Sequence, residues 1–325
     1  MREPTGTPEG RQGTPRPLRG RRAELAEVQA STTRVQQTRS MILVVTGAAG
    51  IGKSRLATEI AARAGRGVYD PCRDAERVAR LWPTVVDAAS RGPVCVCLDD
   101  VDRLDTGAVA ALRATVDEVA ESRVLWCWAM RPAGGRPDVR DAIASILERH
   151  DGSVRRIDLG ALPADEVALV TRDVLGADPN GALRRLTDMA HGNPALLVDL
   201  LVGLVEDGRV SVADGKARIT GRHLPQRTTA TLQRRLARMS PGAHRTVQVA
   251  SVLPSRFSAA TLARALRSRP SRMAADVDEA IRGGFLAEDG ELMAFRHSLV
   301  RKGLRQLAAP TVVTREALTA EGRRT

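Results

Sequence analysis

The amino-acid sequence predicts an α/β fold in its first half, followed by helical segments and a short strand hairpin. Short apolar runs alternate with segments of helical period, and a glycine-rich turn joins the first apolar run to the first helical segment. The apolar runs expected to be strands are 41–46, 67–70, 94–100, 124–130 and 154–159. Because helical segments separate them, these strands are expected to form one parallel sheet with helices on both faces.

The glycine-rich turn reads GAAGIGKS and matches the phosphate-binding pattern G-x-x-x-x-G-K-[ST]. Its backbone N–H groups are expected to point at phosphate oxygens, Lys53 would reach the β- and γ-phosphates, and Ser54 would ligate Mg²⁺. Only three of the 50 Lys and Arg residues are lysines, and arginine is not equivalent to a compact ammonium here. The residues predicted to bind nucleotide in this stretch are Gly47, Ala48, Ala49, Gly50, Ile51, Gly52, Lys53, Ser54 and Arg55.

This turn predicts the sheet of a P-loop NTPase, with ATP or ADP and Mg²⁺ as its cofactors. The alternative is a glycine-rich turn between strand and helix that binds no ligand. Lys53 is counted among the catalytic residues as well as the nucleotide ligands, because it would neutralise charge on the transferred phosphoryl group.

Acidic and basic residues stand at the ends of the third and fourth predicted strands. Asp99 is expected to hold Mg²⁺, and Asp100 is expected to polarise the attacking water. Arg131 follows the fourth strand and is expected to sense the γ-phosphate. Two alternatives remain open, namely that the acids cap the following helix and that Arg131 is a surface residue before a turn.

Composition limits the class of protein. With 325 residues and 43% hydrophobic residues the chain should hold two or three globular domains. No apolar run approaches the ~18 residues of a membrane span. Residues 1–17 are rich in Pro, Gly, Thr and charge, which predicts a disordered tail and not a signal peptide. We therefore expect a cytoplasmic protein that does not contact membranes.

The four cysteines have no CxxC spacing, so they are expected to be buried small side chains and not metal ligands. Cys95 and Cys97 alternate along one predicted strand and should face the same side. Cys127 lies in another apolar run, and Cys72 stands alone.

The net charge of +12 is concentrated near the C-terminus, where residues 226–325 hold 18 basic against 8 acidic residues. Such a region can bind nucleic acid or another acidic partner, or it can be a solvated arginine-rich surface. With 2% aromatic residues, the chain offers no stacking platform for single strands.

The second half is expected to be mostly helical over 161–222, with Gly192-Asn193-Pro194 as the break between two helices. Helices near 228–239, 241–253, 258–267 and 273–283, followed by two short strands in 285–297, predict a winged-helix-like domain. Ser258 should cap the helix 258–267, whose Arg264 and Arg267 could face a DNA major groove. Packing on the sheet domain is the alternative role.

Several motifs together resemble those of STAND-type P-loop ATPases, in particular the ATPase region of large LuxR-type bacterial transcriptional regulators. The matching motifs are LRGRRAEL (18–25), GAAGIGKSRL (47–56), LDDVDRLD (98–105), AMRP (129–132), LGALPADEVALV (159–170), HGNPALLVDLL (191–201) and FRHSLVRKGL (295–304).

The resemblance implies three further nucleotide contacts. Arg21 would meet the base, the backbone at Pro194 would lie near the nucleotide, and His297 would contact a phosphate from the winged helix. An ordinary turn between helices remains the alternative for Pro194. For His297 a hydrogen-bonded structural role, or a catalytic one, remains open.

These expectations define a domain plan and a function. The plan is a disordered tail (1–17), a P-loop nucleotide-binding domain (18–160), a helical lid (161–225), a winged-helix-like domain (226–310) and a C-terminal tail (311–325). The expected function is a slowly hydrolysing ATP-dependent regulatory switch with a protein partner or self-association. The alternatives are a stand-alone DNA-binding regulator and a small-molecule kinase, although no acceptor-binding insertion is evident for a kinase.

Overall fold

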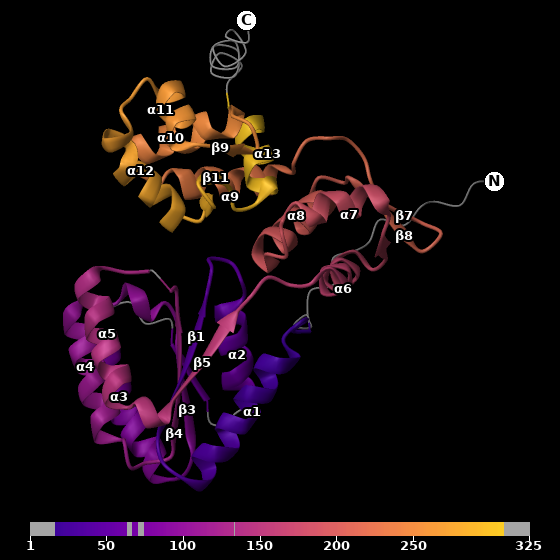
Figure 1. Cartoon of the computed structure of the whole chain (residues 1–325). Helices are drawn as coiled ribbons and strands as arrows, with labels where there is room; N and C mark the ends of the chain where they lie inside the picture. Colours follow the sequence, from indigo (N-terminus) through magenta and orange to yellow (C-terminus); the bar gives the residue numbers. More distant parts are fainter. Residues whose placement is uncertain (1–16, 64–66, 71–74, 133, 309–325) are drawn as a thin grey trace, which may run out of the picture.

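The first half of the chain forms a five-stranded parallel sheet in the order β2-β3-β4-β1-β5 (Figure 1). The computed structural model describes residues 17–63, 67–70, 75–132 and 134–308, so most of both predicted tails and Cys72 lie outside the described residues. The strands are β1 Met41–Gly47, β2 Gly67–Asp70, β3 Val94–Leu98, β4 Val124–Met130 and β5 Val154–Leu159. All five were predicted from the apolar runs, and the α/β fold with a parallel sheet is confirmed.

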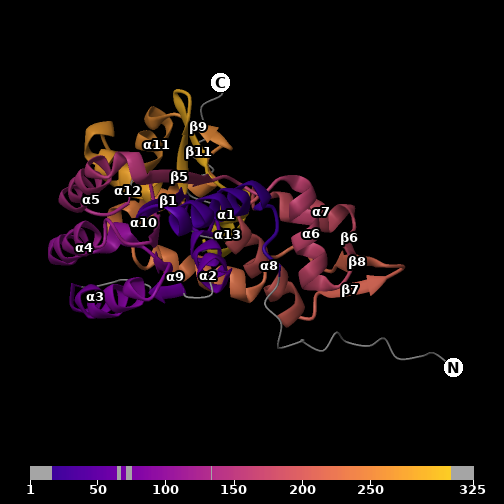
Figure 2. The ribbon, with the colours of Figure 1, turned by 90° about the horizontal axis from the view of Figure 1, so that it is seen from below.

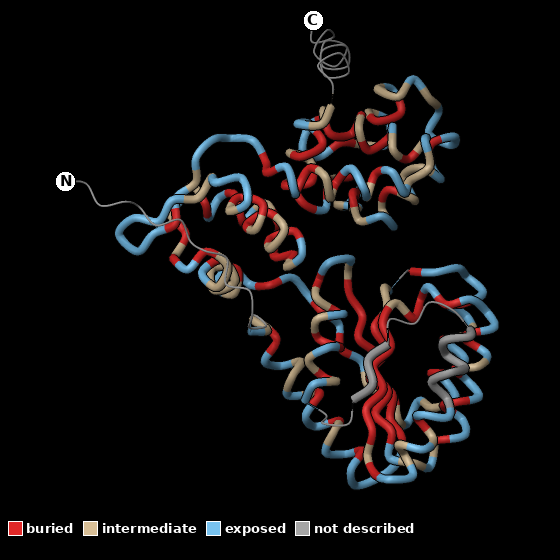
Figure 3. Tube along the Cα trace, turned by 180° about the vertical axis from the view of Figure 1, so that it is seen from behind, coloured by how far each residue is buried: buried red, intermediate tan, exposed pale blue. Residues whose placement is uncertain are grey.

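Helices cover both faces of this sheet, and each face has its own apolar core. The helices are α1 Arg22–Gln37 and α2 Lys53–Arg63 on one face and α3 Ala75–Ser90, α4 Thr106–Glu118 and α5 Pro137–Arg149 on the other (Figure 1). Alternate residues of β1 enter the two cores, with Ile42 and Val44 on the α4–α5 side and Leu43 and Val45 on the α1–α2 side. The sheet is therefore buried on both faces, as parallel sheets are (Figure 3).

The cysteines on the α2 side are buried, as predicted. Cys95 and Cys97 share one face of β3, with their Sγ atoms 3.7 Å apart, and Cys127 lies in the same apolar cluster. In the part of the chain that the structure describes, no group of three His, Cys, Asp or Glu side chains could hold a metal ion. Among these same residues, no helix is both long and apolar enough to cross a bilayer.

The segment 161–225, which we call the lid, contains three helices and a small sheet. The helices are α6 Ala164–Leu175, α7 Gly181–Asp188 and α8 Pro194–Glu206; the strands are β6 Asp178–Pro179, β7 Val210–Ala213 and β8 Lys216–Ile219. The sequence analysis predicted a mostly helical segment and did not predict the hairpin β7–β8, which projects from the molecule (Figure 2). The hairpin forms for a local reason, since Asp214-Gly215 adopts positive φ angles of 53° and 67° between two short alternating runs.

Residues 226–308, which we call the C-terminal unit, contain five helices and three short strands. The elements are α9 Gln226–Leu236, α10 Pro241–Val252, β9 Arg256–Phe257, α11 Ala259–Leu266, α12 Pro270–Arg282, β10 Leu286–Asp289, β11 Leu292–Phe295 and α13 Ser298–Leu307. The four predicted helices and the hairpin are confirmed, and Ser258 caps α11 as expected. Helix α13, for which the sequence analysis predicted no element, begins directly after His297.

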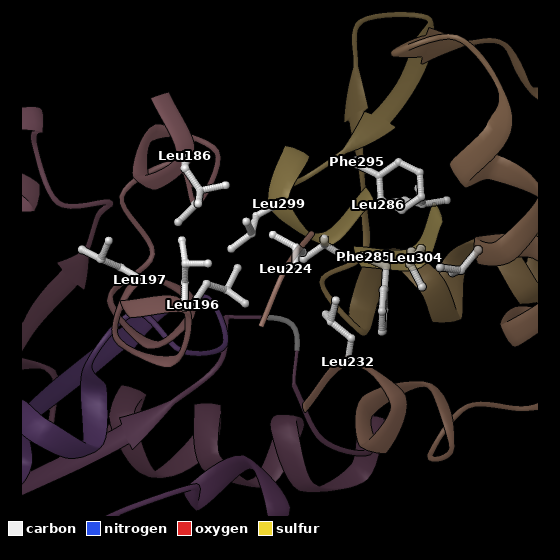
Figure 4. Close-up of a cluster of buried hydrophobic side chains, with 14 of the residues drawn as sticks. Leu186, Leu196, Leu197, Leu224, Leu232, Phe285, Leu286, Phe295, Leu299 and Leu304 are labelled. Carbon is white, nitrogen blue, oxygen red and sulfur yellow. The ribbon is translucent and has the colours of Figure 1, made fainter. Parts of the chain in front are cut away.

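The lid and the C-terminal unit share a single apolar core. Figure 4 shows Leu299 of α13 and Leu224 between the lid leucines, such as Leu196, and the C-terminal leucines, such as Leu304. Among the residues that the structure describes, this core is separate from the two cores of the sheet, so the two segments are expected to move together if they move relative to the sheet.

Candidate functional site

A cavity of about 650 Å³ lies at the carboxyl end of the sheet strands, between the sheet and the lid. Its walls come from the segment before α1, the glycine-rich turn, the ends of β3 and β4, the lid, and one residue of the C-terminal unit. The lining residues used below are Arg19, Arg21, Gly52, Lys53, Ser54, Arg55, Asp100, Arg103, Arg131, Asp173, Pro194, Ala195 and Arg238. The predicted ligands Ala49, Gly50 and Ile51 also line it, whereas Gly47 and Ala48 do not.

The glycine-rich turn joins β1 to α2 and presents an open concave backbone. Gly52 has a φ of 108° and a Cβ placed on it would have no neighbour within 4 Å, so space lies in front of it. Lys53 is 7% exposed, and its Nζ donates to the carbonyls of Gly47 at 2.8 Å and Ala48 at 3.0 Å. Burial lowers the pKa of Lys53, while the carboxylates of Asp102, Asp100 and Asp99 oppose this shift. An ammonium on a concave turn at the N-terminus of a helix, beside a cavity, fits a polyphosphate.

The two acids after β3 take different positions. Asp99 is 7% exposed, and its Oδ1 accepts a hydrogen bond of 3.0 Å from the Asp100 amide. Asp100 lines the cavity in the left-handed conformation, at φ 54°, and its carboxylate pairs with Arg103 at 3.3 Å. A non-glycine residue at positive φ is uncommon and costs free energy, which directs attention to Asp100 as a functional residue. Asp100 stands at the N-cap position of the short 3-10 helix Val101–Arg103 but its side chain makes no capping hydrogen bond there, and α4 is capped by Asp105.

Arg131 after β4 is oriented by a buried carboxylate. Asp102 is 2% exposed, and its Oδ2 accepts a hydrogen bond of 2.9 Å from Nε of Arg131 and lies 2.8 Å from Nη2 in an ion pair. The backbone amide of Arg131 donates to Oδ1 of the same carboxylate at 3.3 Å, so Asp102 holds both the backbone and the guanidinium of Arg131 at the cavity wall. Arg131 is therefore not a free surface arginine. Asp102 is a positioning residue that the sequence analysis did not assign.

Arg21 does not point freely at a nucleotide base. It is 4% exposed, its Nη2 donates to the carbonyls of Ile51 at 3.0 Å and Gly160 at 2.8 Å, and its Nη1 pairs with Glu24 at 3.1 Å. Its side chain clamps the glycine-rich turn to the end of β5, and part of it still lines the cavity. Contact with a base thus remains a prediction, whereas support of the turn is visible.

The break between α7 and α8 binds the glycine-rich turn directly. Asn193 is 2% exposed, caps α8 through its Oδ1, and donates from Nδ2 to the Ala49 carbonyl at 2.9 Å. The Ala195 amide donates to the Gly50 carbonyl at 3.1 Å, and Pro194 lines the cavity as the first residue of α8. Sequence reasoning selected Pro194 but missed Asn193, although an asparagine before a proline is a strong cap signal.

The segment between α7 and α8 also binds the start of α13. The Met189 carbonyl accepts from the Leu299 amide at 2.9 Å. His191, at φ 45°, contacts the Arg296 carbonyl through Nδ1 and the Ser298 hydroxyl through Nε2, both at 3.0 Å. Residues 189–195 therefore connect the glycine-rich turn to α13.

His297 does not line the cavity. It is 8% exposed, packs edge-on against His191 with ring centroids 5.9 Å apart, and its Nδ1 is buried without a hydrogen-bond partner. Contact between His297 and a phosphate would require the start of α13 to move, and it remains a prediction. Burial first, then the electrostatic influence of His191, Arg235 and Arg296, lowers the pKa of His297 from 6.5 to about 4.

His297→Ala should reduce the loss of stability that acid causes. The unfolded imidazole titrates near pH 6.5 and the folded one near 4, so the unfolded state binds the proton first as the pH falls. The part of the free energy of unfolding that depends on neutral His297 is fully present above about pH 6.5. It falls by about 3 kcal/mol in total as the pH approaches 4. This loss of stability is measured by urea unfolding across this pH range. The proteins compared are wild type, His297→Ala and the exposed-site control His223→Ala. A constant difference between wild type and His297→Ala would contradict the prediction.

Comparisons with known proteins agree with this geometry. The AAA ATPase domain family model matches residues 17–89, which contain the glycine-rich turn. The structure resembles a Walker-type ATPase of Pyrococcus abyssi at 14% identity, with a TM-score of 0.53 over 88% of this chain and 98% of that one. It also resembles the ADP form of the ORC2 protein of Aeropyrum pernix at 12% identity, with a TM-score of 0.52 over 95% and 97%. The fold is that of P-loop ATPases.

A STAND protein of Pyrococcus horikoshii with a tetratricopeptide repeat sensor is a weaker structural match, at 13% identity over 91% of this chain and 45% of that one, with a TM-score of 0.35. No curated protein matches the sequence. The relation to LuxR-type regulators therefore remains a prediction.

Proposed function

We propose that this protein is an ATP-binding, slowly hydrolysing switch whose nucleotide state is transmitted to its C-terminal unit. The observation that carries the proposal is the segment 189–195, which is hydrogen-bonded to the glycine-rich turn on one side and to α13 on the other. A ligand that displaces the turn must change these contacts, and only such differential contacts can shift a conformational equilibrium.

In this proposal the cavity residues have distinct roles. Lys53 and the amides of the turn bind the phosphate chain, and Ser54 and Asp99 would hold Mg²⁺, which would neutralise phosphate charge. Asp100 faces the cavity and orients the attacking water. Arg131, held by Asp102, contacts the γ-phosphate, so its environment differs between the triphosphate and diphosphate states.

We also propose that the C-terminal unit is winged-helix-like and acts by packing, not by reading DNA. The order α10, β9, α11, α12, β10, β11, with β9 beside β11, supports this type of domain and makes α12 its third helix, in place of the segment 258–267 selected from sequence. Helix α12 carries the acids Asp276, Asp278 and Glu279 against Arg272 and Arg282. A helix with this charge disfavours a groove lined by phosphates. No observation favours a kinase.

Asn193→Ser tests the transmission. Serine also caps helices but cannot reach Ala49 with an amide donor, so the lid should fold while its bond to the turn is lost. Hydrogen exchange of α13 should respond to MgADP in wild type and respond less in the variant. The matched control is Asn180→Ser, because Asn180 caps α7 without touching the turn. If nucleotide binds and exchange in α13 is unchanged in wild type, the switch proposal is wrong and only nucleotide binding remains.

A further inference from the structure

Arg238 brings the C-terminal unit to the nucleotide cavity. It follows the last turn of α9, is exposed, and is the only residue of the C-terminal unit among the described residues that line the cavity.

The other basic residues that line the cavity already have partners. The pairs are Arg19 with Asp173 at 2.8 Å, Arg21 with Glu24 at 3.1 Å, Arg55 with Glu59 at 3.6 Å, Arg103 with Asp100 at 3.3 Å, Arg131 with Asp102 at 2.8 Å, and Lys53 with the Gly47 carbonyl at 2.8 Å. Within the described chain, the side chain of Arg238 forms no hydrogen bond or ion pair. Its guanidinium is thus free to bind a ligand in the cavity.

The backbone around Arg238 is held in place. Arg227 at the start of α9 pairs with Asp199 at 3.2 Å and with Glu206 at 2.8 Å, both on α8. On the other side, Ser240 caps α10 and its amide donates to Glu279 at 2.8 Å. A ligand therefore has to order one side chain and not a loop, which keeps the entropy cost of binding low.

We propose that Arg238 binds the phosphate chain of the nucleotide and so makes the C-terminal unit part of the nucleotide site. This inference rests on the proposed nucleotide binding. Seven basic side chains line the cavity against the carboxylates of Asp100 and Asp173, an excess that suits a polyanion. Because the bond exists only while the C-terminal unit stays at the cavity, nucleotide binding and docking of that unit strengthen each other equally.

Arg238→Ala should raise the Kd for both MgATP and MgADP about tenfold, the effect of one lost hydrogen bond between charged groups. Arg238→Lys should fall between wild type and alanine, since it keeps the charge without the fork of donors. The matched control is Arg245→Ala, an exposed arginine of α10 that does not line the cavity. Unfolding temperatures without nucleotide should be equal, because within the described chain the side chain of Arg238 forms no hydrogen bond or ion pair.

The outcomes separate this inference from the proposed function. If wild type binds no nucleotide, both fail. If wild type binds and Arg238→Ala binds as tightly as Arg245→Ala, the role of Arg238 alone is overturned. Adenosine, titrated in parallel, should bind wild type and Arg238→Ala equally. If Arg238→Ala lost affinity for adenosine to the same extent, Arg238 would contact the nucleoside, and the assignment to phosphate would be overturned.

Discussion

Lys53→Ala is expected to raise the Kd for MgATP and MgADP at least about 100-fold. The ammonium can donate to two phosphate oxygens, and hydrogen bonds between charged groups are worth about 1.5–3 kcal/mol each. Burial strengthens this effect, because Lys53 is only 7% exposed and water screens it little. Equilibrium titration with a fluorescent nucleotide measures the change.

The structure provides a control for this experiment. Lys216 is an exposed lysine of β8 whose Nζ lies 3.6 Å from Asp178, far from the cavity, so Lys216→Ala should bind nucleotide like wild type. Lys53→Ala also loses the bonds from Nζ to Gly47 and Ala48, and a modest drop in unfolding temperature is expected without nucleotide. Unchanged affinity in a folded Lys53→Ala protein would remove the glycine-rich turn from the site.

The parts of the fold that depend on local pattern could be predicted from the sequence. Each strand of the sheet is a short apolar run, and the glycine-rich turn identifies its own ligand class through residue types at fixed spacing. The hairpin β7–β8 also had a local signal, Asp214-Gly215, but the surrounding helical pattern concealed it. Helix α13 was not predicted, because only the two strands of the preceding hairpin were assigned in this region.

The interactions that organise the site join residues far apart in sequence. Asp102 and Arg131 are separated by 29 positions, and Asn193 and Ala49 by 144. No periodicity or propensity connects such pairs, because their proximity follows from strand order and from the docking of the lid. The same reason explains Arg238, which is an ordinary surface arginine until the C-terminal unit is placed beside the cavity.

Asp100→Asn should lower the rate of ATP hydrolysis about 10²-fold or more while leaving MgATP affinity nearly unchanged. A general base contributes roughly 10²–10⁴-fold, and the amide cannot accept a proton from water. The substitution suits the backbone, because Asp100 lies at φ 54° and asparagine adopts this conformation readily. The change thus removes charge with little effect on structure.

The matched control for this experiment is Asp105→Asn. Asp105 caps α4 through its bond from the Ala108 amide, asparagine caps equally well, and the residue does not line the cavity. Steady-state phosphate release and nucleotide affinity, measured on both variants, separate chemistry from binding. Phosphate release without any added acceptor would also argue against a kinase.

Unchanged turnover in Asp100→Asn would assign the base to another acid, and the structure narrows the choice. Asp102 is the next acid along the chain, but it is 2% exposed and both of its oxygens are engaged by Arg131. Such a carboxylate is poorly placed to accept a proton from water in the cavity. Asp99, which precedes Asp100 at the end of β3, would be the next candidate. Asp99→Asn should then weaken Mg²⁺ binding and also lower the rate of ATP hydrolysis.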